Sequence, residues 1–537
     1  MPFSKTPIQS TYETKRIAFI TNPENRDSGS DKDFHLTNMM VSVVKSPGED
    51  GKRFFVKTRP GLYPYQAGAV GVGRALYWWS VPSTIVSVVG SDLYFGLTLL
   101  FSLTTGSGYV GITEHLDQDA LRTLFVCDGN QGWVIKEDGT YRKCVPDVWT
   151  ASHPTALTAS VIATVGSTGF AYDCTTAGTT DTIEPTWPTT VGTTVTDGTV
   201  VWTCREQAFP SPHVPQPIFL DGYMFLAKRG TQDVYNSQLN YPWKWDAGNF
   251  ISAEMYADEV VSLAKNNNMI YAIGAQSIQF LYDNANPTGS PLLNNPGAVL
   301  QFGTPAMGTV VQTENEVILV GNTGNGGHSV WTIDGFKAKE ISIPAVDSVL
   351  DNDFLLSEAT ATCVRVAGQK LYILFTSTKT LVYSFTTNTW TEWQGPNYTT
   401  FGAQYSSDFV SGSPIWLDKT NGIVYRQDAE GIYRDNNLPY HCRIMTPKLD
   451  FDSMNRKTMS RFSIVGDIPN VAPQVTVTWS DDDYKTWSSW RTLDYNTDLP
   501  AIRQLGDFRR RAFKIDIVSD LMLRLEGIEV DINKGIR

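Results

Sequence analysis

Carboxylates are the first residues to consider for chemistry in this sequence, because a suitably spaced pair of them can hydrolyse a glycosidic bond. The most regular acidic residues stand directly before a glycine, at Asp128, Asp138, Asp197, Asp221 and Asp334. The Asp-Gly pair favours a turn, since the Asp side chain bonds the local backbone and glycine accepts a positive φ. We therefore interpret these carboxylates as turn residues and expect no catalytic site.

Metal ligation finds little support in the sequence. Asp481, Asp482 and Asp483 could offer several oxygens to calcium, but no D-x-D-x-D-G loop surrounds them. The six histidines stand apart from one another and from any H-E-x-x-H motif; they are His35, His115, His153, His213, His328 and His441. We expect neither a resident metal nor a cofactor.

Phosphate binding is also poorly supported. Gly71 and Gly73 form a G-x-G without the parallel strand and helix that nucleotide-binding folds require, and residues 321–329 lack the Lys-Ser/Thr of a phosphate loop. In a strand, Arg510 would face away from Arg509 and Arg511, so this basic run favours an edge or interface role. The formal net charge of −12 further opposes sequence-specific nucleic-acid binding.

The cysteines indicate a reduced protein rather than a zinc or redox site, since none forms a C-x-x-C pair. They are Cys127, Cys144, Cys174, Cys204, Cys363 and Cys442. Cys174 and Cys204 each end a strand-like run; two buried free thiols are favoured over a disulfide, which would need an oxidising compartment. No apolar run is long enough to span a bilayer, so we expect no membrane span.

The elements that position these residues have the pattern of β-strands. Between Phe219 and Gly303, short apolar runs are separated by Asp-Gly, Arg-Gly or an Asn triplet. In residues 269–283 large apolar side chains mostly alternate, and Gly274 and Ala275 mark a turn between two runs. Aromatic residues make up 12% of the sequence, which suits packing between pleated sheets. We predict an all-β fold of successive hairpins.

The hairpins recur at a spacing of roughly 40 to 50 residues, the period of propeller blades. The sequence divides into an extended N-terminal arm at 1–36, which we expect to gain order from a neighbour, and first blades at 37–145. Remaining blades span 210–440, and a C-terminal β region at 441–537 closes the propeller or docks. An abrupt change to Thr, Ser, Ala and Gly predicts an inserted small β domain at 146–209, a candidate platform for fibres or another tail component.

Two resemblances give this organisation a meaning. Residues 185–204, with Trp187, Gly192, Asp197 and Trp202 in place, resemble a small module recurrent in phage tail proteins. Much of residues 55–145 and 215–530 resembles the tail-hub or nozzle proteins of short-tailed phages, also called packaged-DNA stabilisation proteins. The matching residues that we assign structural roles are Arg59, Pro60, Gly61, Ser237, Trp243, Ala253, Glu254, Gly274, Gly303 and Pro305.

A third resemblance lies near the C-terminus. Ser480, Asp482 and Trp487, preceded by Trp479, are similar to the Asp-box S-x-D-x-G-x-T-W of sialidase-like propellers, with Tyr484 in place of the glycine. In that motif side-chain oxygens cap a hairpin turn and the tryptophan packs between blades, so its role is structural. A second departure, from the tail-hub family, is Gln279, which stands where the family usually has an acidic residue.

The tail-hub resemblance implies a β-propeller, and the recurring hairpins favour about six blades, with seven as the alternative. It further implies a virion structural protein of a podovirus tail, made in the host cytoplasm, that forms a hexameric ring below the portal and adaptor. Such a ring retains packaged DNA and forms the channel for DNA ejection. Expected partners are further copies of the chain, the adaptor–portal complex, tail fibre or needle proteins, and genomic DNA in transit. The alternative is a tail propeller that binds or hydrolyses host-surface glycans.

Overall fold

The computed structural model describes residues 12–19, 35–45, 52–165, 169–286, 288–322, 326–396, 400–408, 413–427, 431–495, 497 and 499–534. In this part of the chain, regular structure is almost entirely β, with a single α-helix, α1 (Pro344–Asp351), and two short 3-10 helices, η1 (Met307–Thr309) and η2 (Leu356–Glu358). The chain forms two compact units. Unit 1 comprises residues 1–67, 341–418 and 423–537, and unit 2 comprises residues 68–340 and 419–422.

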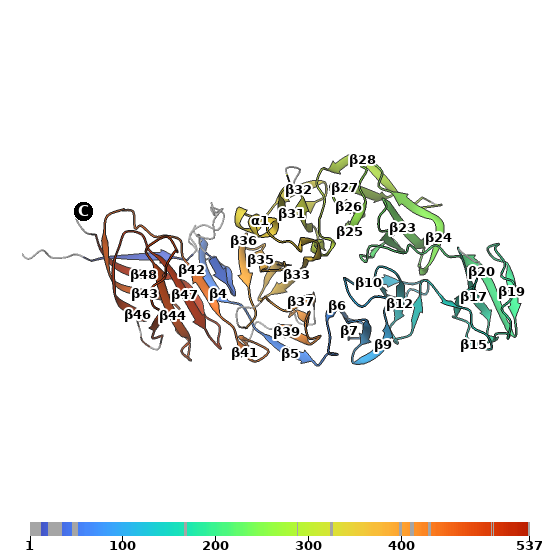
Figure 1. Cartoon of the computed structure of the whole chain (residues 1–537), viewed down its shortest axis with the longest axis horizontal. Helices are drawn as coiled ribbons and strands as arrows, with labels where there is room; N and C mark the ends of the chain where they lie inside the picture. The colour runs from blue at the N-terminus through green and yellow to red at the C-terminus, as the bar shows by residue number, and fades with distance from the viewer. Residues whose placement is uncertain are drawn as a thin grey trace, which may run out of the picture. The chain divides into compact units, whose positions relative to one another are not determined.

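Unit 2 contains five antiparallel four-stranded meanders, the topology of propeller blades (Figure 1). They are β6 (Gly73–Trp79), β7 (Thr84–Val89), β8 (Asp92–Phe95) and β9 (Thr98–Ser102); β10 (Gly111–Leu116), β11 (Arg122–Cys127), β12 (Gly132–Lys136) and β13 (Tyr141–Lys143); β21 (Ile218–Leu220), β22 (Tyr223–Ala227), β23 (Asp233–Gln238) and β24 (Tyr241–Ser252); β25 (Val260–Asn266), β26 (Met269–Gly274), β27 (Ile278–Asp283) and β28 (Leu292–Leu300); and β29 (Val311–Gln312), β30 (Val317–Asn322), β31 (His328–Asp334) and β32 (Lys337–Glu340).

Alternation along the central strands explains why these sheets stack. In β26, Ile270 and Ala272 enter one hydrophobic core while Tyr271 and Ile273 enter the next. All four are almost fully buried, because each sheet is covered on both faces. Successive side chains of a strand point to opposite faces of the sheet, and this alternation lets each sheet pack against a neighbour on both sides.

The inserted segment forms a small β domain with its own core. Its strands are β14 (Asp147–Val148), β15 (Pro154–Thr155), β16 (Ser160–Ile162), β17 (Phe170–Thr176), β18 (Gly178–Thr179), β19 (Thr194–Asp197) and β20 (Val200–Glu206). Five of them form one sheet and β15 pairs with β18. Tyr172 stacks on Trp187 at a centroid distance of 4.1 Å, and Trp202 packs edge-on against Trp187. Trp187 and Trp202 come from the stretch that resembles the phage tail module, and Tyr172 precedes it in β17.

Unit 1 contains two further groups of four strands with blade topology, each part of a larger sheet. One is β33 (Thr360–Val366), β34 (Gln369–Phe375), β35 (Thr380–Ser384) and β36 (Thr389–Trp393). The other joins β37 (Ala403–Ser407), β38 (Ile415–Asp418) and β39 (Val424–Gln427) to the early strand β5 (Leu62–Gln66), followed by β40 (Arg434–Asp435) and β41 (Leu438–Pro439). The described residues thus contain seven groups of four strands of this kind; the number of blades that close a ring stays a prediction.

The remainder of unit 1 is a pair of sheets around one large core. The first contains β3 (Met39–Lys45), β4 (Lys52–Thr58), β48 (Arg524–Lys534), β43 (Lys457–Gly466) and β46 (Ala501–Phe508), with β1 (Glu13–Ala18) also paired to β48. The second contains β2 (His35–Thr37), β42 (Cys442–Met445), β47 (Ala512–Val518), β44 (Gln474–Ser480) and β45 (Arg491–Leu493), and β2 joins it to β36.

The N-terminal residues take a place that the sequence did not predict. We expected residues 1–36 to be ordered by a neighbour and blades to begin at 37. Instead β1 lies antiparallel to β48, and Phe19 is buried in the core of the paired sheets. β3 and β4 also belong to this sheet rather than to a blade, because β4 pairs with β48. The rest of the arm, residues 1–11 and 20–34, lies outside the described residues.

Candidate functional site

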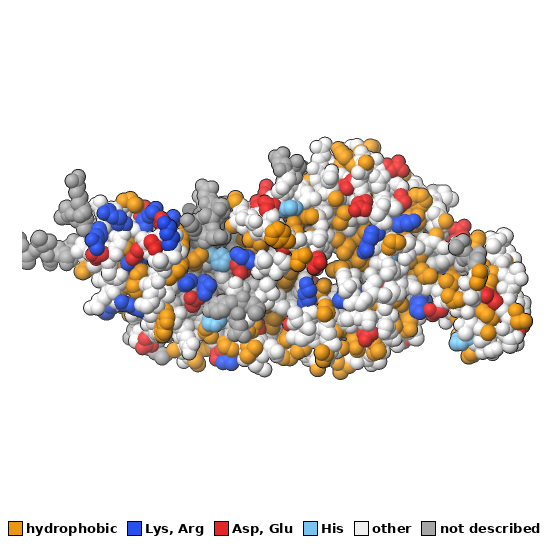
Figure 2. All heavy atoms as spheres, viewed as in Figure 1, with side chains coloured by type: hydrophobic (Ala, Val, Ile, Leu, Met, Phe, Trp, Pro, Cys, Tyr) orange, Lys and Arg blue, Asp and Glu red, His pale blue; other side chains and the backbone are white. Residues whose placement is uncertain are grey.

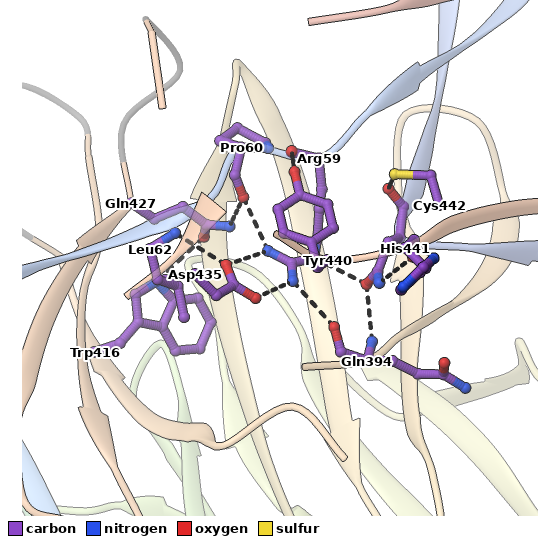
Figure 3. Close-up of polar contacts among 11 residues, drawn as sticks. Arg59, Pro60, Leu62, Gln394, Trp416, Gln427, Asp435, Tyr440, His441 and Cys442 are labelled. Atoms are coloured by element: carbon purple, nitrogen blue, oxygen red, sulfur yellow. Dashed lines mark hydrogen bonds and ion pairs between the residues drawn. The ribbon is translucent and has the colours of Figure 1, made fainter. Parts of the chain in front are cut away.

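The most elaborate polar site in the described residues surrounds Arg59, which lies between β4 and β5 and is completely buried (Figure 3). Its Nε donates to Asn38 Oδ1 at 2.9 Å, and its Nη1 donates to Asp435 Oδ1 at 3.0 Å and to the carbonyl oxygen of Pro60 at 3.1 Å. Its Nη2 donates to the carbonyl oxygen of Gln394 at 3.0 Å and to Asp435 Oδ2. Every nitrogen of the guanidinium that carries a proton therefore has an acceptor.

Aromatic rings cover the faces of this guanidinium. The ring centroids of Tyr440, Phe401 and Trp393 lie 4.0, 4.9 and 5.6 Å from the Arg59 Cζ. The Tyr440 hydroxyl also donates to the carbonyl oxygen of Arg59. Burial alone would lower the pKa of Arg59, but the charge and hydrogen bond of Asp435, together with Tyr440 and Cys442, outweigh burial and raise that pKa. The arginine is therefore a permanently charged, fully paired core residue.

Outer contacts extend the site to several strands. Asn38, at a φ of +55°, accepts from the Gln394 backbone N–H at 2.8 Å and donates from Nδ2 to the carbonyl oxygen of His441 at 2.7 Å. Asp435 Oδ1 additionally accepts from the Leu62 N–H at 3.1 Å. Segments that are more than 300 residues apart in sequence are thus tied together by one charge pair and its hydrogen bonds.

The glycine of the Arg-Pro-Gly motif is required by close backbone approach. A Cβ built on Gly61 would lie 2.3 Å from the carbonyl oxygen of Arg434. The Gly61 N–H meanwhile donates to the carbonyl oxygen of Ile432 at 2.8 Å. Pro60, which has no N–H, contributes a carbonyl oxygen that accepts from both Arg59 and Gln427. The sequence singled out all three motif residues through the family resemblance, and the structure supplies their roles.

A second group of motif residues meets around the turn after β26. The carboxylate of Asp258 accepts from the backbone N–H of Gln276 at 2.7 Å and of Ser277 at 2.9 Å. A Cβ on Gly274 would lie 2.2 Å from Asp258 Oδ2, and a Cβ on Gly303 would lie 2.2 Å from the Gly274 carbonyl oxygen. Gly274 and Gly303 therefore let a carboxylate and two backbone segments converge; Pro305 follows in the chain, partly buried.

Four further predicted residues have separate surroundings. Ser237 Oγ accepts from the backbone N–H of Met224 at 3.0 Å, and Trp243 lies under the Arg142 guanidinium at 5.0 Å. Ala253 is buried, whereas Glu254 is exposed. The structure does not bring these residues into one site.

Gln279, the departure from the family pattern, has a specific place beside Ala253. Its Nε2 donates to the carbonyl oxygen of Ala253 at 2.8 Å, and its Oε1 accepts from the Met255 N–H at 3.2 Å. An ionised carboxylate could accept but could not donate, so an amide suits this position.

The Asp-box lies in unit 1 between β44 and β45. Asp482 Oδ1 accepts from Ser480 Oγ and from the Thr486 backbone N–H, each at 2.9 Å. These bonds, led by that of the Thr486 hydroxyl, lower the pKa of Asp482 to about 2. Tyr484 has a φ of +67°, which explains the glycine usual at this position. The motif is a turn device, as predicted.

The tryptophans of this region lie in the paired sheets instead of between blades. The Trp487 ring lies 4.4 Å from the Lys514 ammonium, on neighbouring β47. Trp479 is partly buried, and the guanidinium groups of Arg491 and Arg511 lie 5.3 and 5.4 Å from its ring. The expected packing between blades is therefore wrong for this motif, because β44 belongs to the two-sheet core.

Asp481, Asp482 and Asp483 each bind groups that lie close to them in the fold. Arg511 binds Asp481 through two hydrogen bonds of 2.7 and 2.8 Å, and Arg510 binds Asp483 at 2.9 Å. Asp482 serves the turn, and no cluster of metal-ligating side chains was found within the described ranges. The expectation that Arg509 and Arg511 would share a strand face is wrong, since Arg509 and Arg510 form the bend between β46 and β47.

The other residues that could have carried chemistry are also built into the fold. Burial lowers the pKa of both His115 and His213 to about 4. Asp138 Oδ1 accepts from the Thr140 N–H across its turn, and Asp197 Oδ2 accepts from the indoles of Trp149 and Trp202. The glycine stretch at 321–329 falls partly outside the described residues, since 323–325 are not among them.

All six cysteines are free thiols. Cys174 and Cys204 share the core of the inserted domain without a bond between them, the arrangement favoured from the sequence. Burial raises the pKa of both thiols. Among the described residues, no helix has the length and apolarity needed to cross a membrane.

On the face of the molecule drawn in Figure 2, the described basic side chains do not form a separate tract. In Figure 2, basic and acidic side chains intermingle over the region of β43, β46 and β48 in unit 1. There Arg461 pairs with Glu529 at 2.6 Å and with Asp531 at 2.7 Å. These hydrogen-bonded pairs, that to Asp531 first, raise the pKa of Arg461. The mixed surface agrees with the acidic net charge.

Comparisons with known proteins show to which family the chain is similar. The family model described as "Bacteriophage P22 Gp10, beta-propeller" matches residues 25–430. No curated protein matches the sequence. The N-terminal domain of Nup159 is similar in structure, with a TM-score of 0.38, 9% identity, and coverage of 74% of this chain and 99% of that chain.

Two further solved structures have similar values. The Pan2 WD40 domain of Neurospora crassa has a TM-score of 0.33 and 9% identity, and the match covers 78% of this chain and 97% of that domain. Streptogramin B lyase has a TM-score of 0.33 and 10% identity, and the match covers 68% of this chain and 97% of the lyase. Scores this low carry no argument about function. The family model and the repeated four-stranded meanders confirm the predicted β-propeller.

Proposed function

Because this chain belongs to the bacteriophage family described as P22 Gp10, beta-propeller, we propose that it is a tail hub or nozzle subunit. The family match over residues 25–430 is the observation that carries this proposal. In it, copies of the chain form a hexameric ring below the portal and adaptor. The ring retains packaged DNA and forms the channel through which the genome leaves.

The chemistry of the site supports a structural role. The Arg59 guanidinium, the Asp258 carboxylate and the Asp482 carboxylate are each occupied by hydrogen bonds within the chain. Such groups fix the segments that they bind and leave no reactive atom for a substrate. The Asp-box gives no support to a glycan-processing activity, since its carboxylate caps a turn. We therefore propose that the protein is not an enzyme.

Charge supports a role in DNA passage. The chain has 55 acidic and 43 basic residues, and a wall with negative charge repels phosphates, so that DNA slides past it. Neutralising contacts to phosphate would instead hold the DNA back. Transient, sequence-independent passage is the mode of contact that this composition favours.

The inserted domain is the proposed attachment platform for fibres, a needle or another lower tail component. It has its own sheet and core, so it is organised separately from the blades that flank it. Removing residues 150–208 tests this role. Rings that form normally but fail to bind fibres support the platform; rings that still bind fibres contradict it.

DNA retention provides the test of the function itself. A phage with a stop codon in this gene is grown in a non-suppressing host, and the DNA content of the particles is measured before and after dilution. The proposal predicts particles that package DNA and then lose it, with retention restored by the added protein. Particles that keep their DNA and have complete tails would contradict it.

A further inference from the structure

Three cations gather around one carboxylate where the inserted domain meets the blades of unit 2. Arg205 Nε donates to Asp173 Oδ1 at 3.0 Å, and the closest nitrogen of Arg142 lies 3.6 Å from the same oxygen. Lys244 Nζ lies 3.8 Å from Asp173 Oδ2. Asp173 and Arg205 come from β17 and β20 of the inserted domain, Arg142 from β13 and Lys244 from β24.

Donors exceed acceptors in this cluster. Asp173 Oδ1 already accepts from Ser160 Oγ at 2.6 Å, and Ser160 accepts from Arg142 Nη2 at 2.7 Å. Arg205 Nη1 donates to Gln207 Oε1 at 2.7 Å. Among the residues that the structure describes, Arg142 Nε and Arg205 Nη2 are nevertheless buried without an acceptor.

A buried, charged N–H without an acceptor is costly, and an ion that supplies the acceptor is one of its ordinary explanations. The Arg205 side chain is only 9% exposed, so bulk water does not replace the missing partner. Arg142 and Lys244 each keep 26% of their side chains exposed and form the solvent side of the cluster. A small ion can therefore approach from that side.

The charges around the cluster favour an anion. Asp246, the other acid that acts on Lys244, has both oxygens bound by Gln238 Nε2 at 2.9 Å. Burial, followed by the repulsion of neighbouring cations, lowers the pKa of Lys244 against the pull of Asp173. Burial likewise lowers the pKa of Arg142.

We infer that Arg142, Arg205 and Lys244 form a binding site for an oxyanion next to Asp173. Two planar guanidinium groups match the oxygens of phosphate, sulfate or a carboxylate, and a lysine adds a point charge. The occupant is a free phosphate or sulfate ion, or the carboxylate of a protein segment that docks at the base of the inserted domain. This inference concerns binding alone and does not rest on the proposed tail function.

Calorimetric titration of the full chain with inorganic phosphate, at constant ionic strength, tests the site. We expect saturable binding with one site per chain and a rise in the unfolding temperature of unit 2 with phosphate. Acetate serves as the carboxylate probe. Binding of phosphate alone identifies the free ion as the occupant, whereas comparable binding of both identifies carboxylates as accepted ligands.

Variants connect the binding to the cluster. Lys244→Met should weaken phosphate binding by about tenfold, because it removes one charge-assisted contact. Asp173→Asn should strengthen it, because the resident carboxylate no longer competes for the cations. Lys265→Met is the matched control, since Lys265 is another partly buried lysine of unit 2 and donates to the carbonyl oxygen of Phe219.

The outcomes that overturn the inference are equally definite. One is the absence of saturable binding of either anion to the unmodified chain. The other is equal affinity of the Lys244→Met and Lys265→Met variants, which would mean that the anion binds elsewhere. Circular dichroism of each variant confirms folding, and Arg142→Met replaces Lys244→Met if the latter fails to fold.

Discussion

Two charged clusters in this molecule, one around Arg59 and one around Asp173, differ in how completely their hydrogen-bond donors are paired with acceptors. Around Arg59, each nitrogen donates, aromatic rings cover the guanidinium and Asp435 neutralises it. Around Asp173, three cations share one carboxylate, and two buried nitrogens have no acceptor in the described residues. A complete set of partners marks a residue that holds the fold together, whereas surplus donors mark a place for a ligand.

Replacing the two arginines should separate these roles most clearly. Arg59→Met leaves Asp435 charged and buried without its partner, which costs about 3 to 5 kcal/mol in such pairs. Arg142→Met removes one of three cations that share a single carboxylate, and we expect the free energy of unfolding to fall by about 1 kcal/mol or less. Urea unfolding followed by tryptophan fluorescence measures both. Similar losses for the two variants would show that the contrast is not real.

Replacing the two carboxylates tests the same contrast from the acidic side. Asp435→Asn should reduce the free energy of unfolding by about 1.5 to 3 kcal/mol, whether or not phosphate is present. The effect of Asp173→Asn should depend on phosphate, because a bound anion can take over the role of the carboxylate. Unfolding temperatures with and without phosphate distinguish the two. A phosphate-dependent Asp435→Asn variant would contradict this assignment.

Backbone packing around Arg59 provides a third comparison. The Cβ of a Gly61→Ala variant would meet the Arg434 carbonyl oxygen at 2.3 Å, so the backbone must shift at a cost of about 1 to 3 kcal/mol. Gly106→Ala is the matched control, since nothing lies within 4 Å of a Cβ there and its φ is not positive. Thermal unfolding should show a clear loss for the first variant and almost none for the second.

The exposed Asp-box should show the smallest effect and a distinct pH dependence. Hydrogen bonds from Thr486 lower the pKa of Asp482 to about 2 from the ordinary aspartate value of 3.8. The ionised group therefore stabilises the folded state above pH 3.8, and this contribution is lost as the pH falls toward 2. An Asp482→Asn variant should unfold at a lower temperature than the unmodified chain at neutral pH. A difference in unfolding temperature that persists at pH 2 would disagree with this origin.

Much of the fold could be predicted from the sequence because blade strands are local. The alternation of Ile270, Tyr271, Ala272 and Ile273 is visible in the sequence, and it is what divides these side chains between two cores. The pairing of β1 and β4 with β48 was not predictable, since it joins segments from opposite ends of the chain. No local pattern encodes a partner that far away.

The candidate sites also contain some residues that the sequence identified and others that it did not. Arg59, Pro60 and Gly61 were identified by their motif, but Asp435 lies 376 residues from Arg59 and carries no motif of its own. Asp173, Arg142, Arg205 and Lys244 were not identified, because they converge only when the inserted domain folds against the blades. The Asp-box was identified because its donors and acceptors lie within seven residues, from Ser480 to Thr486.

The mass of the purified protein in solution, alone and with the portal–adaptor complex, tests the proposed tail role most directly. Light scattering should show a hexameric ring on the adaptor, formed from chains that are monomeric alone or already assembled. A chain that keeps the same smaller mass with and without the adaptor would contradict a hub or nozzle. The family fold would then serve a different function in this protein.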